Sequence, residues 1–158
     1  MRCFLVSALL VITLSHPALA GGLEPFPGIK YSTMKAFNFN AKIGRPKCMM
    51  PLNKDGSLCS SVKGPGKRLS KKQARTLLEI LNEPASYQPF FAKCFIPRHA
   101  IVLYDAKGKA VAQVSICFEC NGLQIEPSRP KRRSLAKGAR YNLQDLCLEL
   151  GLKNCWEN

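Results

Sequence analysis

The sequence predicts an α+β fold: a small antiparallel sheet built around one β-hairpin, flanked by two amphipathic helices and stapled by disulfides or a metal. Three observations lead to this fold class. Two apolar runs meet at the turn Ala106-Lys107-Gly108, two segments have helical periodicity, and cysteines are dense for a chain of 158 residues.

The first twenty residues have the pattern of a secretory signal. Arg2 precedes an apolar run over 3–14, and Pro17-Ala18-Leu19-Ala20 supplies the small residues of a cleavage site. The run is shorter than the about 20 residues that a membrane-spanning helix needs, so no transmembrane segment is expected. Gly21, rather than a cysteine, follows the site, which argues against a lipid anchor. We expect cleavage after Ala20 and an exported, periplasmic or extracellular product.

Removal of the signal leaves seven of the eight cysteines and lowers the net charge from +14 to +13, because Arg2 is lost. In an oxidising compartment such a density favours disulfide bonds. Seven is an odd number, so at least one cysteine is a free thiol, a metal ligand or an intermolecular partner. The predicted division of the chain is a signal at 1–20, a loop-rich region at 21–66 and an α+β domain at 67–158.

The region 21–66 is rich in Pro, Gly, Asn and Lys, which predicts loops and short strands. Met34, Ala36, Phe37 and Phe39 form one weakly alternating strand candidate. Cys48 and Cys59 flank the turn 53–56, so a local disulfide is expected between them.

Two helices are predicted on opposite sides of the hairpin in the sequence. Ser70 and Gln73 form a capping box ahead of an apolar stripe, and Asn82 with Pro84 ends this helix. The second helix begins between residues 134 and 142, and Gly151 suits the position after its end. Its apolar stripe comprises Ala139, Leu143, Leu146, Cys147 and Leu150. A disulfide between Cys147 and Cys155 is expected at its end, since Cys147 would otherwise be an inert buried thiol.

The hairpin register follows from the turn. If Gly108 takes the left-handed position of a three-residue loop, Asp105 faces Lys109, Ile101 faces Gln113 and His99 faces Ser115. Strand alternation then predicts one almost wholly apolar core face: Ala100, Val102, Tyr104, Ala110, Ala112, Val114, Ile116 and Phe118. The mixed face carries His99, Ile101, Leu103, Val111, Gln113, Ser115 and Cys117. A slip of one residue would exchange these faces.

Sulfur and imidazole groups gather at the hairpin end away from the turn. Cys94, His99, Cys117 and Cys120 are four zinc-compatible ligands, although the four-residue gap between Cys94 and His99 is wide for a zinc ribbon. A disulfide from Cys94 to Cys120 or Cys117, with His99 as a hydrogen-bonded residue, explains the same residues. A redox Cys-x-x-Cys pair and a Cys117 nucleophile with His99 as base are two further interpretations. The sequence leaves these four alternatives open.

Several motifs together resemble a group of uncharacterised exported bacterial proteins. The motifs are Leu69-Ser70, Cys94-Phe-Ile-Pro-Arg-His99, Tyr104-Asp105, Ile116-Cys117-Phe-Glu-Cys120 and Leu146-Cys147-Leu-Glu-Leu-Gly-Leu152. The resemblance covers about residues 69–155 and omits the basic segment ahead of the last helix. It implies a recurrent extracytoplasmic domain and nothing about catalysis.

Basic residues dominate two stretches. The segment 129–140 contains no acid, and 42–75 holds ten basic residues against Asp55 alone. The first segment supplies the predicted binding residues Arg129, Lys131, Arg132, Arg133, Lys137 and Arg140. Such a concentration of positive charge attracts polyanions. Tyr141 is the only aromatic residue beside the run, so nucleic-acid binding by base stacking is not supported.

Two classes of function remain. The first is a non-enzymatic binding module, such as an inhibitor, an immunity-type protector or an envelope accessory protein, that docks an acidic protein or an anionic envelope polymer. The second is a small zinc- or thiol-dependent enzyme centred on His99 and Cys117. We favour the first, because the chain lacks a paired-carboxylate or nucleophile-elbow motif and keeps only one histidine after cleavage.

Overall fold

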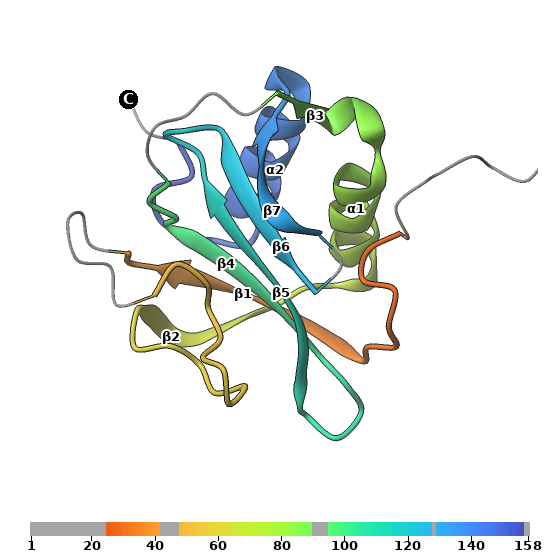
Figure 1. The fold of residues 1–158 in the computed structure, drawn as a ribbon, viewed down its shortest axis with the longest axis vertical. Coiled ribbons are helices and arrows are strands. Elements are labelled where there is room, and N and C mark those ends of the chain that lie inside the picture. The colour runs from red at the N-terminus through yellow and green to blue at the C-terminus, as the bar shows by residue number, and fades with distance from the viewer. Residues whose placement is uncertain (1–24, 42–47, 90–94, 128, 157–158) are drawn as a thin grey trace, which may run out of the picture.

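A computed structural model describes residues 25–41, 48–89, 95–127 and 129–156. They form one seven-stranded antiparallel sheet in the order β2-β1-β4-β5-β6-β7-β3, with both long helices packed on one face (Figure 1). The strands are β1 (Thr33–Phe39), β2 (Val62–Arg68), β3 (Tyr87–Gln88), β4 (His99–Tyr104), β5 (Ala110–Cys117), β6 (Gly122–Glu126) and β7 (Arg129–Leu135). The helices are α1 (Lys71–Asn82), the short 3-10 helix η1 (Pro84–Ser86) and α2 (Lys137–Glu149). The predicted signal at 1–20 lies outside the described residues.

The predicted small sheet around one hairpin is wrong. The hairpin β4–β5 forms the middle of a much wider sheet, which β1 and β2 extend on one side and β6, β7 and β3 on the other. Sequence reasoning also missed β6, which lies inside the sheet and alternates apolar with polar residues in Gly-Leu-Gln-Ile-Glu. Two other missed strands, β2 and β7, lie toward the sheet edges and have little apolar alternation. β2 reads Val-Lys-Gly-Pro-Gly-Lys-Arg and β7 reads Arg-Pro-Lys-Arg-Arg-Ser-Leu. Charges and prolines are typical of edge strands, where they prevent pairing with other chains, so these strands resemble loops in the sequence.

The hairpin register is correct at the turn and wrong beyond it. Gly108 has a φ of 79°, and the Asp105 amide donates to the Lys109 carbonyl at 2.9 Å, as predicted. An irregularity after Leu103 then shifts the pairing by one residue, so that His99 faces Ile116 rather than Ser115. A β-bulge inserts one extra residue into one strand and leaves its partner unchanged. The predicted faces are therefore wrong, because one strand was assigned to the opposite side relative to the other.

The corrected helix-side face is apolar except for His99. It combines Ile101 and Leu103 of β4 with alternate residues of β5, and it packs against α1 and α2. Leu77 and Leu81 of α1 are completely buried there. Burial of such leucines supplies the main stabilising free energy of this layer, roughly 1.5–3 kcal/mol for each side chain.

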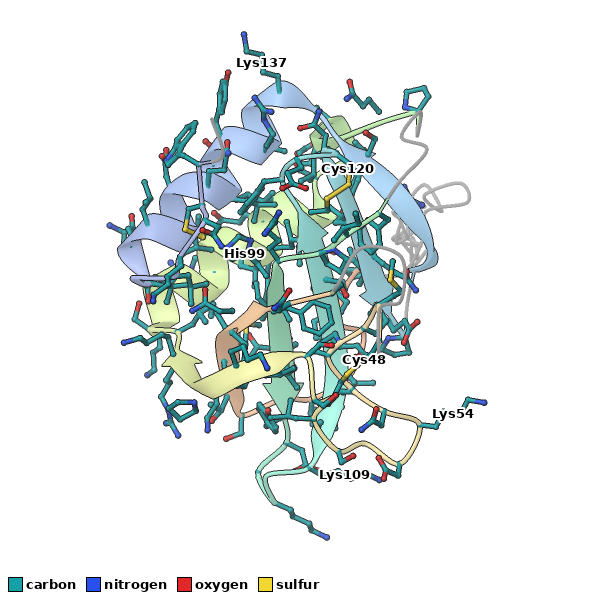
Figure 2. All side chains as sticks on the ribbon, turned by 90° about the vertical axis from the view of Figure 1, so that its left-hand side faces the viewer. Cys48, Lys54, His99, Lys109, Cys120 and Lys137 are labelled. Atoms are coloured by element: carbon teal, nitrogen blue, oxygen red, sulfur yellow. A yellow bond between two sulfur atoms is a disulfide. The ribbon has the colours of Figure 1, made fainter. Side chains whose placement is uncertain are left out.

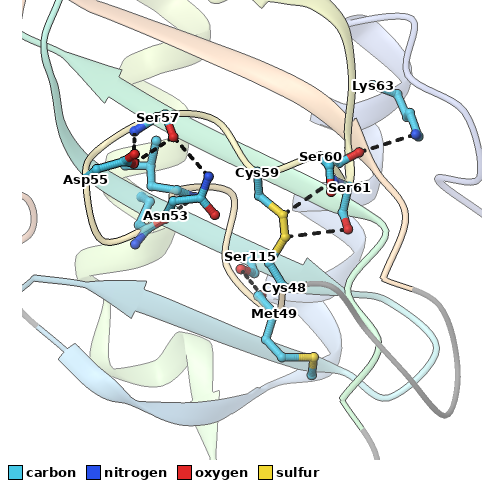
Figure 3. The surroundings of a disulfide bond; sticks show 12 residues. Cys48, Met49, Asn53, Asp55, Ser57, Cys59, Ser60, Ser61, Lys63 and Ser115 are labelled. Atoms are coloured by element: carbon cyan, nitrogen blue, oxygen red, sulfur yellow. Dashed lines mark hydrogen bonds between the residues drawn. A yellow bond between two sulfur atoms is a disulfide. The ribbon is translucent and has the colours of Figure 1, made fainter.

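The opposite face carries the buried polar residues of β5 and is covered in part by the segment 48–61 (Figure 3). Ser115 donates its hydroxyl to the Met49 carbonyl at 2.8 Å, and the Leu52 amide donates to the Gln113 side-chain oxygen at 2.8 Å. Because buried polar groups need partners, these two residues fix this segment on the sheet. The predicted strand around Met34 is confirmed as β1, which lies inside the sheet between β2 and β4.

Both predicted helices are confirmed. The Ser70 hydroxyl accepts from the Gln73 amide at 3.2 Å, and the Gln73 side chain accepts from the Ser70 amide at 2.9 Å, which completes the capping box. Gly151, with φ of 63°, follows α2 and turns the chain back toward the sheet. Neither helix has the length and apolar character of a membrane span within the part of the chain that the structure describes.

Candidate functional site

The structure divides six of the sulfurs into three pairs. Cys48 with Cys59 and Cys147 with Cys155 lie at disulfide distance, with Cα separations of 6.5 and 5.7 Å, which confirms both expected pairs. Cys117 and Cys120 form the third pair, with a Cα separation of 5.6 Å. Cys94 lies outside the described residues, so a disulfide from Cys94 stays a prediction. The structure does not bring the other three predicted zinc ligands together: Cys117 is paired with Cys120, and His99 lies on the other face of the sheet.

His99 and Cys117 do not share a face of the sheet. His99 is paired with Ile116, and paired residues of antiparallel strands project to the same side. Cys117 is the next residue along β5, so its side chain projects to the other side. The predicted nucleophile and base are therefore separated by the sheet itself.

The imidazole of His99 instead lies beside the C-terminal disulfide. One ring nitrogen of His99 and the sulfurs of Cys147 and Cys155 lie within 4.8 Å of one another, and all three residues are at most 4% exposed. We call these three residues the imidazole–sulfur cluster. The three residues belong to β4, to the buried stripe of α2 and to the tail that follows Gly151. His99 is labelled in Figure 2.

Hydrogen bonds hold the tail over the cluster. The Nε2 of His99 lies 2.7 Å from the carbonyl oxygen of Lys153, and the Lys153 amide donates to the Asn38 side chain at 2.9 Å. The buried Gln144 side chain donates to the Cys155 carbonyl at 2.9 Å. The His99 ring also packs on Phe118, with 5.0 Å between ring centroids.

Burial sets the charge state of His99. Loss of solvent contact is the main cause that lowers the pKa of His99 from its ordinary value of 6.5. The hydrogen bond to Lys153 acts in the opposite direction, and the positive charge of Arg98 lowers the pKa further. The ring is therefore neutral at pH 7. A carbonyl oxygen only accepts hydrogen bonds, so the proton is on Nε2 and the lone pair is on Nδ1.

The basic segment 129–140 forms a strand followed by the first turn of a helix. Residues 129–135 form β7, and of Arg129, Lys131 and Arg132 the structure describes only the backbone. The other three cations lie over aromatic rings, with Arg133 5.1 Å from the Tyr87 centroid. Lys137 and Arg140 lie 5.7 and 4.9 Å from the Tyr141 centroid. These three charges already make cation–π contacts within the domain.

A larger open site lies between the start of β1 and the outer side of α1. It is a groove of about 700 Å³, which we call the cationic groove. Its lining residues are Tyr31, Ser32, Thr33, Met34, Arg68, Leu69, Ser70, Lys71, Ala74, Arg75, Leu78, Glu79 and Asn82. Arg68, Lys71 and Arg75 are exposed cations, and Glu79 is the single acid among these residues.

The groove combines charge with apolar surface. Met34 and Leu69 are buried beneath it, and Ala74 and Leu78 of α1 are partly buried along one side. Lys71, Ala74, Arg75 and Leu78 share one stripe of α1 because residues three or four apart lie on the same side of a helix. This arrangement suits an elongated ligand that carries both acidic and apolar groups.

Searches with this chain against protein-family models, curated proteins and solved structures find no match.

Sequence reasoning missed the groove and the composition of the imidazole–sulfur cluster. The excess of basic residues over 42–75 was visible, but only the fold shows that Arg68, Lys71 and Arg75 border one cavity. The proximity of His99 to Cys147 and Cys155 has no local signal, because about fifty residues separate them in the sequence.

Proposed function

We propose that this protein is an exported, disulfide-stapled basic module that binds an acidic protein segment in the cationic groove. One observation carries the proposal: this groove of about 700 Å³ is bordered by three exposed cations from the end of β2 and the first turns of α1, against one carboxylate. Positive potential over a groove raises both the rate of encounter with an acidic partner and the selectivity for it.

The groove favours a polypeptide over a plain anionic polymer. An anionic polymer needs only charge, whereas the apolar residues along the groove contribute binding free energy only to a ligand with apolar groups of its own. The ligand class that uses both features is a segment with acidic and apolar side chains. An inhibitor or immunity-type protector would dock its target in this way.

The enzyme interpretation receives less support. Its two central residues, His99 and Cys117, project to opposite sides of the sheet, and Cys117 is paired with Cys120. A nucleophile and its base must come within hydrogen-bond reach of each other.

The test is equilibrium binding of three labelled probes to the mature protein at several salt concentrations. The probes are a glutamate–leucine peptide, a glutamine–leucine peptide of equal length, and polyphosphate. We expect the glutamate–leucine peptide to bind most tightly and to weaken with added salt, because exposed charges are screened beyond about 10 Å at 0.1 M.

A matched pair of triple variants locates the site. Arg68→Ala/Lys71→Ala/Arg75→Ala removes the groove cations, and Lys54→Ala/Lys107→Ala/Lys109→Ala removes the same charge from exposed loops, two of them labelled in Figure 2. Only the first variant is expected to lose binding, by about tenfold or more, since about 1.4 kcal/mol corresponds to tenfold. Equal losses in both variants would mean that net charge alone attracts the ligand. Equal affinity for polyphosphate would favour an envelope polymer as partner, and loss only in Arg132→Ala/Arg133→Ala would place binding on β7.

A further inference from the structure

The imidazole–sulfur cluster has a feature that the binding module does not need. His99 is 2% exposed, and its Nδ1 has no hydrogen-bond partner among the described residues. A buried polar atom without a partner costs free energy, typically about 1–3 kcal/mol. Here the unpartnered atom belongs to a neutral imidazole that lies beside two sulfurs.

The hydrogen bond at the other ring nitrogen is of the kind found in metal sites. A histidine that binds a metal usually donates its second ring N–H to a backbone carbonyl or a carboxylate, which fixes the ring and its tautomer. His99 meets this condition through Nε2 and the Lys153 carbonyl, 2.7 Å apart. The lone pair on Nδ1 is therefore not committed to another group.

We propose that reduction of the Cys147–Cys155 disulfide converts the imidazole–sulfur cluster into a site for Zn²⁺ or a similar thiophilic divalent cation. The reductant is a dithiol: it transfers two electrons and two protons to the disulfide, gives two cysteine thiols and becomes a disulfide itself. Metal binding then releases two protons, because the ligands are the two thiolates and the neutral imidazole.

The required rearrangement is small. Sulfurs that bind one tetrahedral Zn²⁺ at about 2.3 Å lie about 3.8 Å apart, against about 2.0 Å in a closed disulfide. Cys147 is fixed in α2, but Cys155 belongs to the non-helical tail and can supply most of the displacement. A small cavity of about 20 Å³, lined in part by His99 and Cys147, adjoins the cluster. Its other lining residues are apolar, so a water that filled it as the fourth ligand would be held by the metal alone.

The test is cobalt titration of the full mature chain after reduction with a phosphine under anaerobic conditions. Bound Co²⁺ with thiolate ligands gives a charge-transfer band and intense visible bands, and Zn²⁺ should displace it. Circular dichroism is recorded on the same samples. We expect one Co²⁺ per chain in the reduced protein and none in the oxidised protein.

Three variants assign the ligands. His99→Gln and Cys147→Ser/Cys155→Ser should each weaken Co²⁺ binding by about 100-fold or more, since loss of even an outer-shell partner costs 10–100-fold. Cys117→Ser/Cys120→Ser should retain the site. The proposal is overturned if the loss occurs only in Cys117→Ser/Cys120→Ser, if the folded reduced chain binds no Co²⁺, or if the reduced chain stays unfolded with Zn²⁺ present.

Discussion

The imidazole–sulfur cluster buries its polar groups, whereas the cationic groove leaves its charged groups exposed to solvent. In the cluster, a neutral His99 and two sulfurs are closed off by the tail after Gly151. In the groove, three cations stay in solvent beside apolar residues of α1. Buried groups change stability when altered, whereas exposed charges mainly change encounters with partners. A ligand can therefore reach the groove in the folded protein, whereas the cluster binds a metal only after its disulfide has been reduced.

The largest difference in the free energy of unfolding is expected between substitutions on the two sides of α1. Leu77→Ala removes a side chain that is completely buried against the sheet, and it should lower the free energy of unfolding by about 2–5 kcal/mol. Arg75 lies on the groove side of α1, and Arg75→Ala should change the free energy of unfolding by no more than about 0.5 kcal/mol. Urea unfolding of both variants measures this. Similar losses for both would mean that the groove side is also part of the core.

Loss of the disulfide at the cluster should have the next largest effect. Cys147→Ser/Cys155→Ser opens a link across eight residues, which should cost about 2–3 kcal/mol. Cys117→Ser/Cys120→Ser opens a link across three residues and should cost less, since the entropy of loop closure grows with loop length. Denaturant titrations without reductant would show the order. A larger loss for the second variant would mean that the tail does not hold the domain together.

The pH dependence of the free energy of unfolding should reveal the buried imidazole of the cluster. Because burial lowers the pKa of folded His99 below 6.5, the unfolded chain binds this proton more tightly than the folded chain. The contribution of neutral His99 to the free energy of unfolding should therefore be fully present above pH 6.5. It should fall as the pH is lowered below 6.5, by at most about 1.4 kcal/mol per pH unit. His99→Gln should remove most of this slope in oxidised protein with a chelator present. The exposed Asp55, whose pKa is held below 3.8 by the Ser57 hydroxyl, titrates below this range. An unchanged slope in the variant would contradict the assignment.

The ion pair next to the cluster should contribute least. Arg98 and Glu119 lie 2.6 Å apart, but their side chains are 38% and 37% exposed. Exposed pairs are worth about 0–1 kcal/mol and weaken with salt. Glu119→Gln should lower the unfolding free energy by that amount at low salt and by less at 0.5 M salt. A salt-independent loss above this range would indicate a structural role for Glu119.

The sequence predicted those elements whose signals are local. The capping box at Ser70, the stripe of α2, the turn at Gly108 and both disulfides that close short segments follow from residues near one another in the chain. The edge strands could not be predicted in the same way, because charges and prolines conceal them. The bulge after Leu103 was equally hidden, and it alone moved His99 from the predicted mixed face to the helix side.

The candidate sites were less predictable than the fold. His99 was singled out correctly as unusual, but its neighbours come from α2 and the tail, far along the chain. The predicted binding residues Arg133, Lys137 and Arg140 lie over tyrosine rings, and the groove cations were seen only as an excess of charge. Long-range contacts decide both sites, and residue spacing does not encode them.

The most direct test of the binding proposal is NMR mapping of the backbone amides of the mature, oxidised protein during titration with the glutamate–leucine peptide. The account predicts that the shifted amides cluster in Tyr31–Met34 and along the groove side of α1, from Lys71 to Leu78. It also predicts that β7 and the loop tips around Lys54 and Lys109 stay unchanged. Shifts confined to residues 129–140, or spread evenly over every basic segment, would contradict the cationic groove as the binding site.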